Sequence, residues 1–267
     1  MLSTPKFFGL LAVSAMALTL ACGGGEAPEG GAESAAESAQ SSAPAGELTE
    51  VDPAVAATIT GKISFEGEAP KPARLNLGAD EECKSMHDEP IFSEQVVVNE
   101  NGTLANVFVW VSKGLEGKQF PTPSEKVSID QEGCVYMPHV VGAMVGQTVS
   151  VTNSDPMLHN VHPLPRDNDE WNQSQAAGAG AIDKSFDEPE LMIPVKCNIH
   201  PWMRAYINVS PHPFFAVTGD DGSFTISGLP PGTYTIEAAH EKYGTQTMEV
   251  TVGDGATEQA DLTFQAE

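Results

Sequence analysis

The chain has 267 residues, of which 40% are hydrophobic and 19% charged, so it can form one or two domains with hydrophobic cores and is not disordered throughout. Its formal net charge of −24 excludes nucleic acid and anionic lipid headgroups as partners of the folded part, and it either attracts a basic partner or simply keeps the protein soluble. The 25 glycines and 20 prolines, among many runs of valine, threonine and isoleucine, predict an all-β fold of short strands and turns.

Residues 1–21 carry one lysine and then the apolar run Phe7 to Leu20, which is too short to span a membrane and predicts a secretory signal peptide. Leu18 to Cys22 resembles a bacterial lipoprotein cleavage box, although its leucine stands one position early. We expect cleavage before Cys22 and acylation of its sulfur, with an ordinary cleaved secretory signal as the alternative. The mature chain would then have 37 acidic and 12 basic residues and lie in the bacterial cell envelope, facing the periplasm or the exterior.

Residues 22–52 consist mainly of glycine, alanine, serine, glutamate and proline, and have almost no large apolar side chains. Such a segment cannot bury enough surface to offset its ordering entropy, so we expect a disordered tether that links the folded part to the lipid anchor. The anchor would be the protein's only contact with the membrane.

From residue 53 the sequence alternates in the way that β-strands do. In a first segment, 53–125, we expect strands at 57–65, 95–98 and 104–111, the last two joined in a hairpin across Asn101-Gly102. In a second segment, 126–210, we expect strands at 127–129, 135–140, 148–151, 190–197 and 205–209, with a long surface loop at 167–184. A third segment, 211–267, continues with a hairpin of 215–218 and 223–226 across Gly219 to Gly222, followed by strands at 233–236, 247–252 and 260–264.

The most informative stretch is Cys197-Asn198-Ile199-His200-Pro201-Trp202-Met203, together with His159, which lies 38 residues upstream. One thiolate, two imidazoles and a thioether form a soft ligand set, of the kind that holds a single copper ion in blue electron-transfer sites. Three of the four donors fall within seven residues, a length that one loop can fold around an ion. The strand at 190–197 would deliver Cys197 inward at its end.

This loop and Pro156-Met157-Leu158-His159-Asn160-Val161-His162 resemble the cupredoxin family, and the Cys-x2-His-x2-Met spacing is most similar to that of amicyanin. The resemblance covers roughly 127–209 and implies a Greek-key β-sandwich with one type 1 copper. It further implies that His159, Cys197 and His200 are equatorial ligands and Met203 a long axial one.

The same resemblance assigns roles to residues around the copper. Asn160 would brace the two ligand loops, the N–H of Asn198 would donate to the thiolate, and Pro201 would have no N–H to offer it. The ring edge of His200 would be the electron port, inside a docking collar formed by Pro156, Met157, Pro201 and Trp202.

Two cysteines remain once Cys22 is assigned to lipid and Cys197 to metal, so Cys83 and Cys134 are a candidate disulfide in an oxidising compartment. Five other side chains near these motifs are expected to have structural roles rather than to bind metal: His87, His139, His162, His240 and Arg204. His240 in particular is expected at the surface or opposite a neighbouring strand.

Gly222 to Ile226 with Leu229-Pro230-Pro231-Gly232-Thr233-Tyr234 resembles the carboxypeptidase regulatory-like domain, a small transthyretin-type, immunoglobulin-like β-sandwich. Residues 211–267 are few for such a domain, and Gly61 to Phe65 resembles its missing opening strand. We therefore expect 53–125 to pack with 211–267, with the copper domain 126–210 inserted between them. The alternative adds 53–125 to the copper domain itself, and strand pairing between 104–111 and 215–226 would decide for the nested arrangement.

Together these features predict a lipid-anchored blue copper protein that carries single electrons between redox proteins, with a c-type cytochrome as a natural transient partner. It is expected not to be an enzyme, because a copper oxidoreductase would need a second, open metal site and the sequence has no further clustered histidines. Two alternatives stay open: a copper-binding or delivery protein, and a cell-surface interaction module with a vestigial site.

Overall fold

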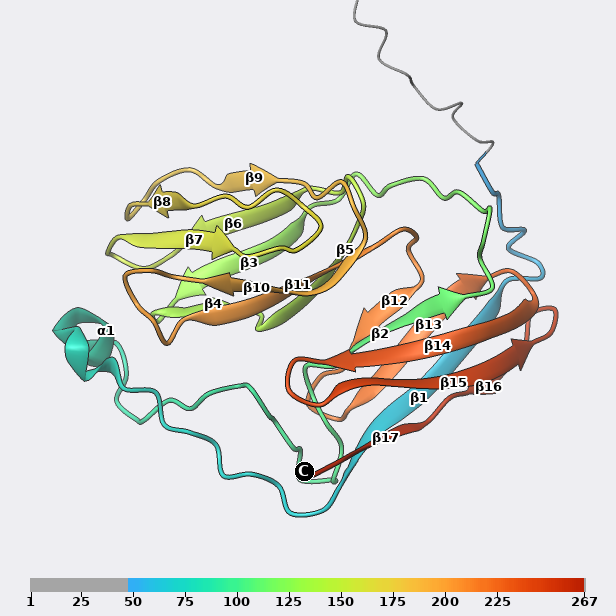
Figure 1. The fold of residues 1–267 in the computed structure, drawn as a ribbon, viewed down its shortest axis with the longest axis horizontal. Coiled ribbons are helices and arrows are strands. Elements are labelled where there is room, and N and C mark those ends of the chain that lie inside the picture. Colours follow the sequence, from blue (N-terminus) through green and yellow to red (C-terminus); the bar gives the residue numbers. More distant parts are fainter. Residues whose placement is uncertain (1–47, 267) are drawn as a thin grey trace, which may run out of the picture. The chain divides into compact units, whose positions relative to one another are not determined.

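The computed structural model describes residues 48–266, and their regular structure is almost entirely β-strand, as Figure 1 shows. The predicted all-β fold class is therefore confirmed. The helical exceptions among these residues are the short 3-10 helix η1 (Leu77–Ala79) and the single-turn helix α1 (Glu81–Ser85). No helix in this range has the length and apolar character needed to cross a membrane.

The predicted signal peptide, the lipidated Cys22 and most of the predicted tether lie outside the described residues. Residues 48–52, the end of the predicted tether, lie within the described range, and the backbone N–H of Thr49 donates to the carbonyl of Gln119 at 2.6 Å.

Two sheets enclose the core of the segment 126–210. One has the order β5-β11-β10-β7-β8 and the other β4-β3-β6-β9. Their strands are β3 (Val127–Glu132), β4 (Val135–Met137), β5 (Val140–Met144), β6 (Val149–Asn153), β7 (His159–Pro163), β8 (Gln173–Gln175), β9 (Ile182–Lys184), β10 (Glu190–Lys196) and β11 (Arg204–Ser210). One cluster of buried side chains, which includes Ile129, Val151, Ile193 and Ile207, fills the space between them. We call this unit the first sandwich.

The remaining strands form the second sandwich, which has two sheets. One has the order β13-β1-β16, with β17 also paired to β1, and the other has the order β12-β2-β14-β15. The strands are β1 (Ala57–Glu66), β2 (Phe108–Lys113), β12 (Phe215–Val217), β13 (Ser223–Leu229), β14 (Gly232–His240), β15 (Gly244–Val252), β16 (Thr257–Gln259) and β17 (Leu262–Gln265). A separate core cluster, with Ile59, Val109, Ile226 and Ile236 among its members, lies between these sheets.

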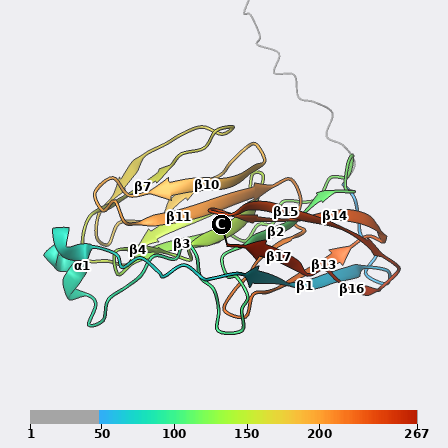
Figure 2. The same ribbon diagram turned by 60° about the horizontal axis from the view of Figure 1, so that its bottom comes forward.

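Strands from both ends of the described chain interleave in the second sandwich. β1 pairs antiparallel with β13 and parallel with β16 and β17, while β2 pairs with β12 through Phe215 opposite Trp110. This last pairing is the one that the nested arrangement requires. Figure 2 shows the blue β1 lying beside the red β17 of the C-terminus. The first sandwich is consequently continuous in sequence, and the second is built from two segments on either side of it.

One predicted hairpin is wrong, and another is present but shorter than expected. The strands at 215–218 and 223–226 do not pair with each other, because β12 joins β2 and β13 joins β1 in a different sheet. The hairpin across Asn101-Gly102 is short: Val98 bridges Leu104, and backbone hydrogen bonds join Asn99 to Thr103 and Ala105 to Val97, but residues 95–98 form no regular strand. Asn106 then adopts a positive φ of 61°, which ends the local extended run before β2 begins.

Two other element boundaries differ from the prediction. The strand predicted at 135–140 is divided into β4 and β5 at Pro138, which has no N–H to contribute to a sheet. The loop predicted at 167–184 contains β8 and β9, which pair with β7 and β6. Their polar sequences lack a strand pattern, and each is an edge strand with one neighbour in its sheet.

Gly61 tests the pairing of β1 with the C-terminal strands. A Cβ atom at this position would lie 2.0 Å from the carbonyl oxygen of Ala260 and 2.7 Å from the ring of Phe224. We expect Gly61→Ala to lower the free energy of unfolding by about 1–3 kcal/mol, the usual cost of overpacking. Urea denaturation of the soluble chain measures this, with Gly253→Ala, which meets no atom within 4 Å, as the control. Equal stability of the two variants would contradict the observed packing.

Candidate metal centre

Cys197 lies at the end of β10, where the chain turns back into β11. The two strands pair antiparallel up to Lys196 opposite Arg204, so residues 197–203 must close a tight loop. The N–H of Met203 donates to the carbonyl of His200 at 3.0 Å, and the N–H of His200 donates to Cys197 Sγ at 3.4 Å. The backbone of the loop thus folds inward around the sulfur atom.

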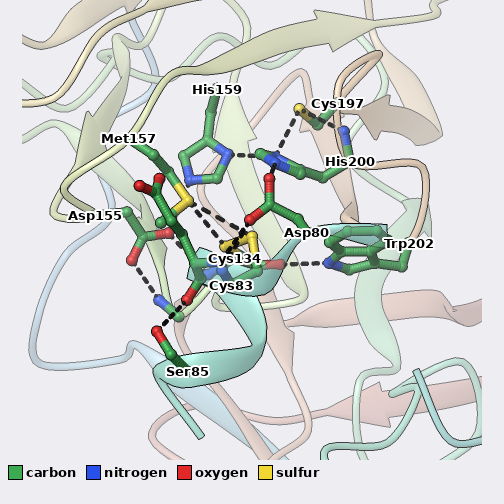
Figure 3. The surroundings of a disulfide bond; sticks show 12 residues. Asp80, Cys83, Ser85, Cys134, Asp155, Met157, His159, Cys197, His200 and Trp202 are labelled. Carbon is green, nitrogen blue, oxygen red and sulfur yellow. Dashed lines mark hydrogen bonds and ion pairs between the residues drawn. A yellow bond between two sulfur atoms is a disulfide. The ribbon is translucent and has the colours of Figure 1, made fainter. Parts of the chain in front are cut away.

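His159 reaches this loop because it begins β7, the other neighbour of β10 in the sheet. Its Nδ1 lies 2.8 Å from Nδ1 of His200, and the latter lies 3.8 Å from Cys197 Sγ. The three donor atoms are all within 4.8 Å of one another, and none of the three residues is more than 3% exposed. The structure therefore brings together three of the four residues predicted as ligands, as Figure 3 shows.

Met203, the predicted axial ligand, is fully buried in the same loop and belongs to the same core cluster as Cys197. Its backbone carbonyl accepts a hydrogen bond from the N–H of Cys197 at 3.4 Å, which ties the two ends of the loop together.

Asn160 makes the bracing hydrogen bond that was predicted for it. Its Oδ1 accepts from the N–H of Asn198 at 2.7 Å and lies 3.4 Å from Cys197 Sγ. The predicted role of Asn198 is therefore wrong, because its N–H is used by Asn160, and the N–H that donates to the sulfur belongs to His200. His162 is not in the cluster, and its ring bonds Asn198 Oδ1 at 3.1 Å and Glu170 at 2.6 Å.

Two aspartates that were missed at the sequence level contact the outer nitrogens of the histidines. Asp155 Oδ2 lies 2.8 Å from Nε2 of His159 and Asp80 Oδ2 lies 3.4 Å from Nε2 of His200. Asp155 stands four residues before His159, a spacing that could have suggested the contact. Asp80 is 120 residues from His200, and no local signal indicates it.

Each histidine is thus oriented with Nδ1 toward the cluster and Nε2 toward a carboxylate. The Asp155 carboxylate is itself held by the N–H groups of Gly133 and Cys134, at 2.6 and 2.8 Å. A carboxylate on the far nitrogen is the usual way in which proteins fix the tautomer and ring orientation of a metal-binding histidine.

The protonation states of the cluster are strongly shifted. Burial by itself would lower the pKa of His159, but Asp155 and the Cys197 sulfur outweigh it and raise this pKa to about 9. Burial would raise the pKa of the Cys197 thiol, yet hydrogen bonds from His159 and from loop N–H groups hold this pKa below its usual value. Burial, with the positive charge of His159, lowers the pKa of His200. In the metal-free cluster the contact between Cys197 and His159 thus favours the thiolate on one side and the imidazolium on the other.

The surface around the cluster differs from the predicted collar. His200 is only 3% exposed, so its ring edge is not an open port. Met157 is also buried, and its sulfur lies 3.5 and 3.3 Å from the sulfurs of Cys83 and Cys134, which form the predicted disulfide. Pro156 and Pro201 are exposed and Trp202 is half-buried, as a collar requires. Two exposed apolar neighbours of the ligands, Leu158 and Ile199, were missed.

The remaining histidines have structural contacts, as expected. His87 Nε2 lies 2.7 Å from the carbonyl of Gly133, and His139 bridges the carbonyl of Arg204 at 3.1 Å and Glu241 at 2.5 Å. The side chain of Arg204 is exposed. His240 lies opposite Gly244 on the neighbouring strand but is only 2% exposed, so it is a core residue, and burial lowers its pKa to about 4.

The donor set fits a soft transition-metal ion. Metal bonds of about 2.0 Å to imidazole and about 2.3 Å to thiolate, as at zinc sites, require donors that converge from roughly 3 to 4 Å apart. The two nitrogens are 2.8 Å apart and the sulfur lies 3.8 Å from His200 Nδ1, so a small separation of the rings would admit an ion, and the lowered thiol pKa favours the thiolate that a metal needs. His159, Cys197 and His200 would hold the ion.

Comparisons with known proteins give short or distant matches. The family profile of the carboxypeptidase regulatory-like domain matches residues 201–265. A copper-containing nitrite reductase from Thermus scotoductus SA-01 is 21% identical over 35% of this chain, with a TM-score of 0.31, and the chain spans 24% of its length. A purple cupredoxin from Nitrosopumilus maritimus is 22% identical over 32% of this chain and 99% of its own, with a TM-score of 0.28.

A point mutant of amicyanin in its Cu(I) form is 24% identical over 32% of this chain and 82% of its own, with a TM-score of 0.29. No curated protein matches this sequence.

The high pKa of His159 can be measured in the metal-free protein by following its ring signals in an NMR titration. We expect a midpoint near pH 9, and a lower midpoint in Asp155→Asn, because the substitution removes the negative charge at Nε2. A metal ion must displace the imidazolium proton of His159, so metal affinity should rise with pH and level off near pH 9 in the wild type. In Asp155→Asn it should level off at a lower pH. Asp169→Asn, at an exposed position in the same sandwich, is the control. An unchanged His159 midpoint in Asp155→Asn would contradict the assignment.

Proposed function

We propose that this protein is a blue copper protein of the cell envelope that carries single electrons between redox proteins. The observation that carries the proposal is the convergence of His159 Nδ1, His200 Nδ1 and Cys197 Sγ in one buried pocket, with Met203 buried in the same loop. Copper bound there would supply a one-electron couple, because thiolate and thioether favour Cu(I) and imidazole accepts both oxidation states.

The chain's own residues would keep the structural change between oxidation states small. Asp155 and Asp80 fix the two rings from outside, and Asn160 ties the Cys197 loop to β7, so the donors have little freedom to move. The N–H of His200 donates to the sulfur and would spread some of the thiolate's negative charge onto the backbone. Burial of all three donors excludes water from the ion.

Lipid attachment at Cys22, the tether and a periplasmic or exterior location complete the proposal, and they rest on the sequence alone. We propose a carrier rather than an enzyme, with a c-type cytochrome as the transient partner. The net charge of −24 would steer a basic partner toward the protein, and most strongly at low salt.

The burial of His200 favours a second candidate, a protein that binds or delivers copper, because such a protein need not present a ligand edge to a redox partner. It predicts weak, exchangeable Cu(I) and no stable blue oxidised form. A cell-surface interaction module with a vestigial site would bind no copper with the intense thiolate-to-copper colour.

Addition of Cu(II) to the soluble chain from residue 46 tests these candidates through its visible and EPR spectra. We expect one blue copper per chain in the wild type and loss of the blue colour in Cys197→Ser, because the colour comes from the thiolate bond. A colour that survives in Cys197→Ser would overturn the proposal. Asn168→Ser, which changes a loop side chain that bonds Glu190, is the control and should stay blue.

Leu158 and Ile199 are 48% and 45% exposed and each stands next to a ligand histidine, so they are the proposed docking contacts. We expect the double substitution Leu158→Ser with Ile199→Ser to slow electron transfer to a basic c-type cytochrome by roughly 5- to 30-fold, the effect of ~1–2 kcal/mol of lost contact energy. Stopped-flow spectroscopy at low salt measures the rate, and the blue spectrum should not change. Leu48→Ser, at a leucine that is 54% exposed, is the matched control, and an equal loss there would contradict this docking surface.

A further inference from the structure

A segment from outside the first sandwich covers the ligand His200. We call residues 77–88, which contain η1 and α1, the cap segment. One oxygen of Asp80 accepts the N–H groups of Glu82 and Cys83 at the start of α1, which turns its other oxygen toward Nε2 of His200 at 3.4 Å. Together with Trp202, whose ring centre lies 5.2 Å from that of His200, this contact leaves the histidine 3% exposed (Figure 3).

The backbone of the cap segment has no sheet to hold it in place. Among the described residues, the backbone hydrogen bonds of 73–93 all stay within that stretch, as in Leu75 to Ile91 and Ser93 to Ala73. A cavity of about 600 Å³ opens within it, lined by Arg74, Leu77, Lys84 and Ile91 among others. The cap segment therefore has little packing of its own and depends on side-chain attachments.

Those attachments to the first sandwich are few. Cys83 is joined to Cys134 by the disulfide, with Met157 packed against both sulfurs. The other contacts are His87 Nε2 with the Gly133 carbonyl at 2.7 Å and Asp80 with His200. The disulfide is the covalent one, and its Cys83 sulfur lies within 4.8 Å of a ring nitrogen of His200.

We propose that the cap segment closes the metal centre and that the Cys83–Cys134 disulfide is the latch that holds it closed. The metal that it would protect is the copper of the proposed function, but the closure is a property of the protein without metal. An external dithiol would open the latch: one thiolate attacks a sulfur of the bridge to form a mixed disulfide, and its second thiol displaces the protein thiol. The bridge gains two electrons and two protons to give two thiols, and the dithiol leaves as its own disulfide.

Opening the latch leaves only non-covalent contacts between the cap segment and the sandwich. The ring edge of His200, and the free thiol of Cys197 behind it, would then be exposed to small reagents and to a partner's surface. The oxidation state of the bridge would thus decide whether the centre is accessible.

The test measures chemical access in the metal-free protein. Diethylpyrocarbonate modification of His200 is followed by peptide mass spectrometry in the wild type and in the double variant Cys83→Ser with Cys134→Ser. We expect modification of His200 to be roughly tenfold faster or more in the variant, because no covalent link then restrains local opening of the cap segment. His212, a core histidine in the other sandwich that is 5% exposed, is the internal control and should not change. An unchanged rate at His200 would overturn the proposal.

The unsubstituted protein gives an independent measurement, in case the variant folds poorly. Hydrogen exchange is compared before and after reduction with dithiothreitol. We expect the amides of residues 81–87 to lose protection while those of β10 and β11 keep theirs. Retained protection in the cap segment, or equal loss in β10 and β11, would overturn a local latch.

The copper-loaded protein completes the design. Copper extraction by a chelator should be faster after reduction of the Cys83–Cys134 disulfide, and faster in the double variant than in the wild type. If no form of the protein binds blue copper, the proposed function is wrong, and the His200 modification rate and hydrogen exchange still decide whether the cap segment closes the site. A blue protein with unchanged His200 reactivity would remove the cap alone.

Discussion

The Nδ1 atoms of His159 and His200 face each other at 2.8 Å in a pocket with almost no solvent, and this contact organises the first sandwich around it. Two imidazolium rings this close in a buried site would repel each other, so the positive charge of His159 lowers the pKa of His200. Acidic groups surround the pair: Cys197 lies on the inside, and Asp155 and Asp80 lie at the outer nitrogens. A bound cation would replace the imidazolium proton within the same set of contacts.

The strand order explains how these residues meet. β10 lies between β7 and β11, so one pairing brings the His159 strand to the Cys197 loop and the other closes the loop itself. The second sandwich is joined to this unit through a contact between the buried side chains of His139 and Glu241, and through Phe108 against Gly142. Each sandwich keeps its own core.

The connection from β1 to β2 links the two sandwiches in a different way. Its ends belong to the second sandwich, but its middle, with α1, reaches the metal centre of the first and is joined to it by a disulfide. The strands of residues 53–125 pair with those of 211–267 and none joins the first sandwich, but the short helix of this segment lies on the first sandwich. This one segment therefore contacts both the candidate metal centre and the second sandwich.

The sequence alone determined the ligand candidates, the free cysteine, the disulfide pair and most strands, because these depend on residue type, local spacing and alternation. Strand partners were less predictable: Gly219 to Gly222 has the composition of a hairpin turn, but β13 pairs with β1 and β12 with β2, and partners that are distant in sequence leave no local signal. Only the tertiary structure decided that Asp80 and Cys83 cover His200 and that the N–H of Asn198 is used by Asn160. These are contacts between distant segments, and neither composition nor periodicity records which surfaces a folded chain brings together.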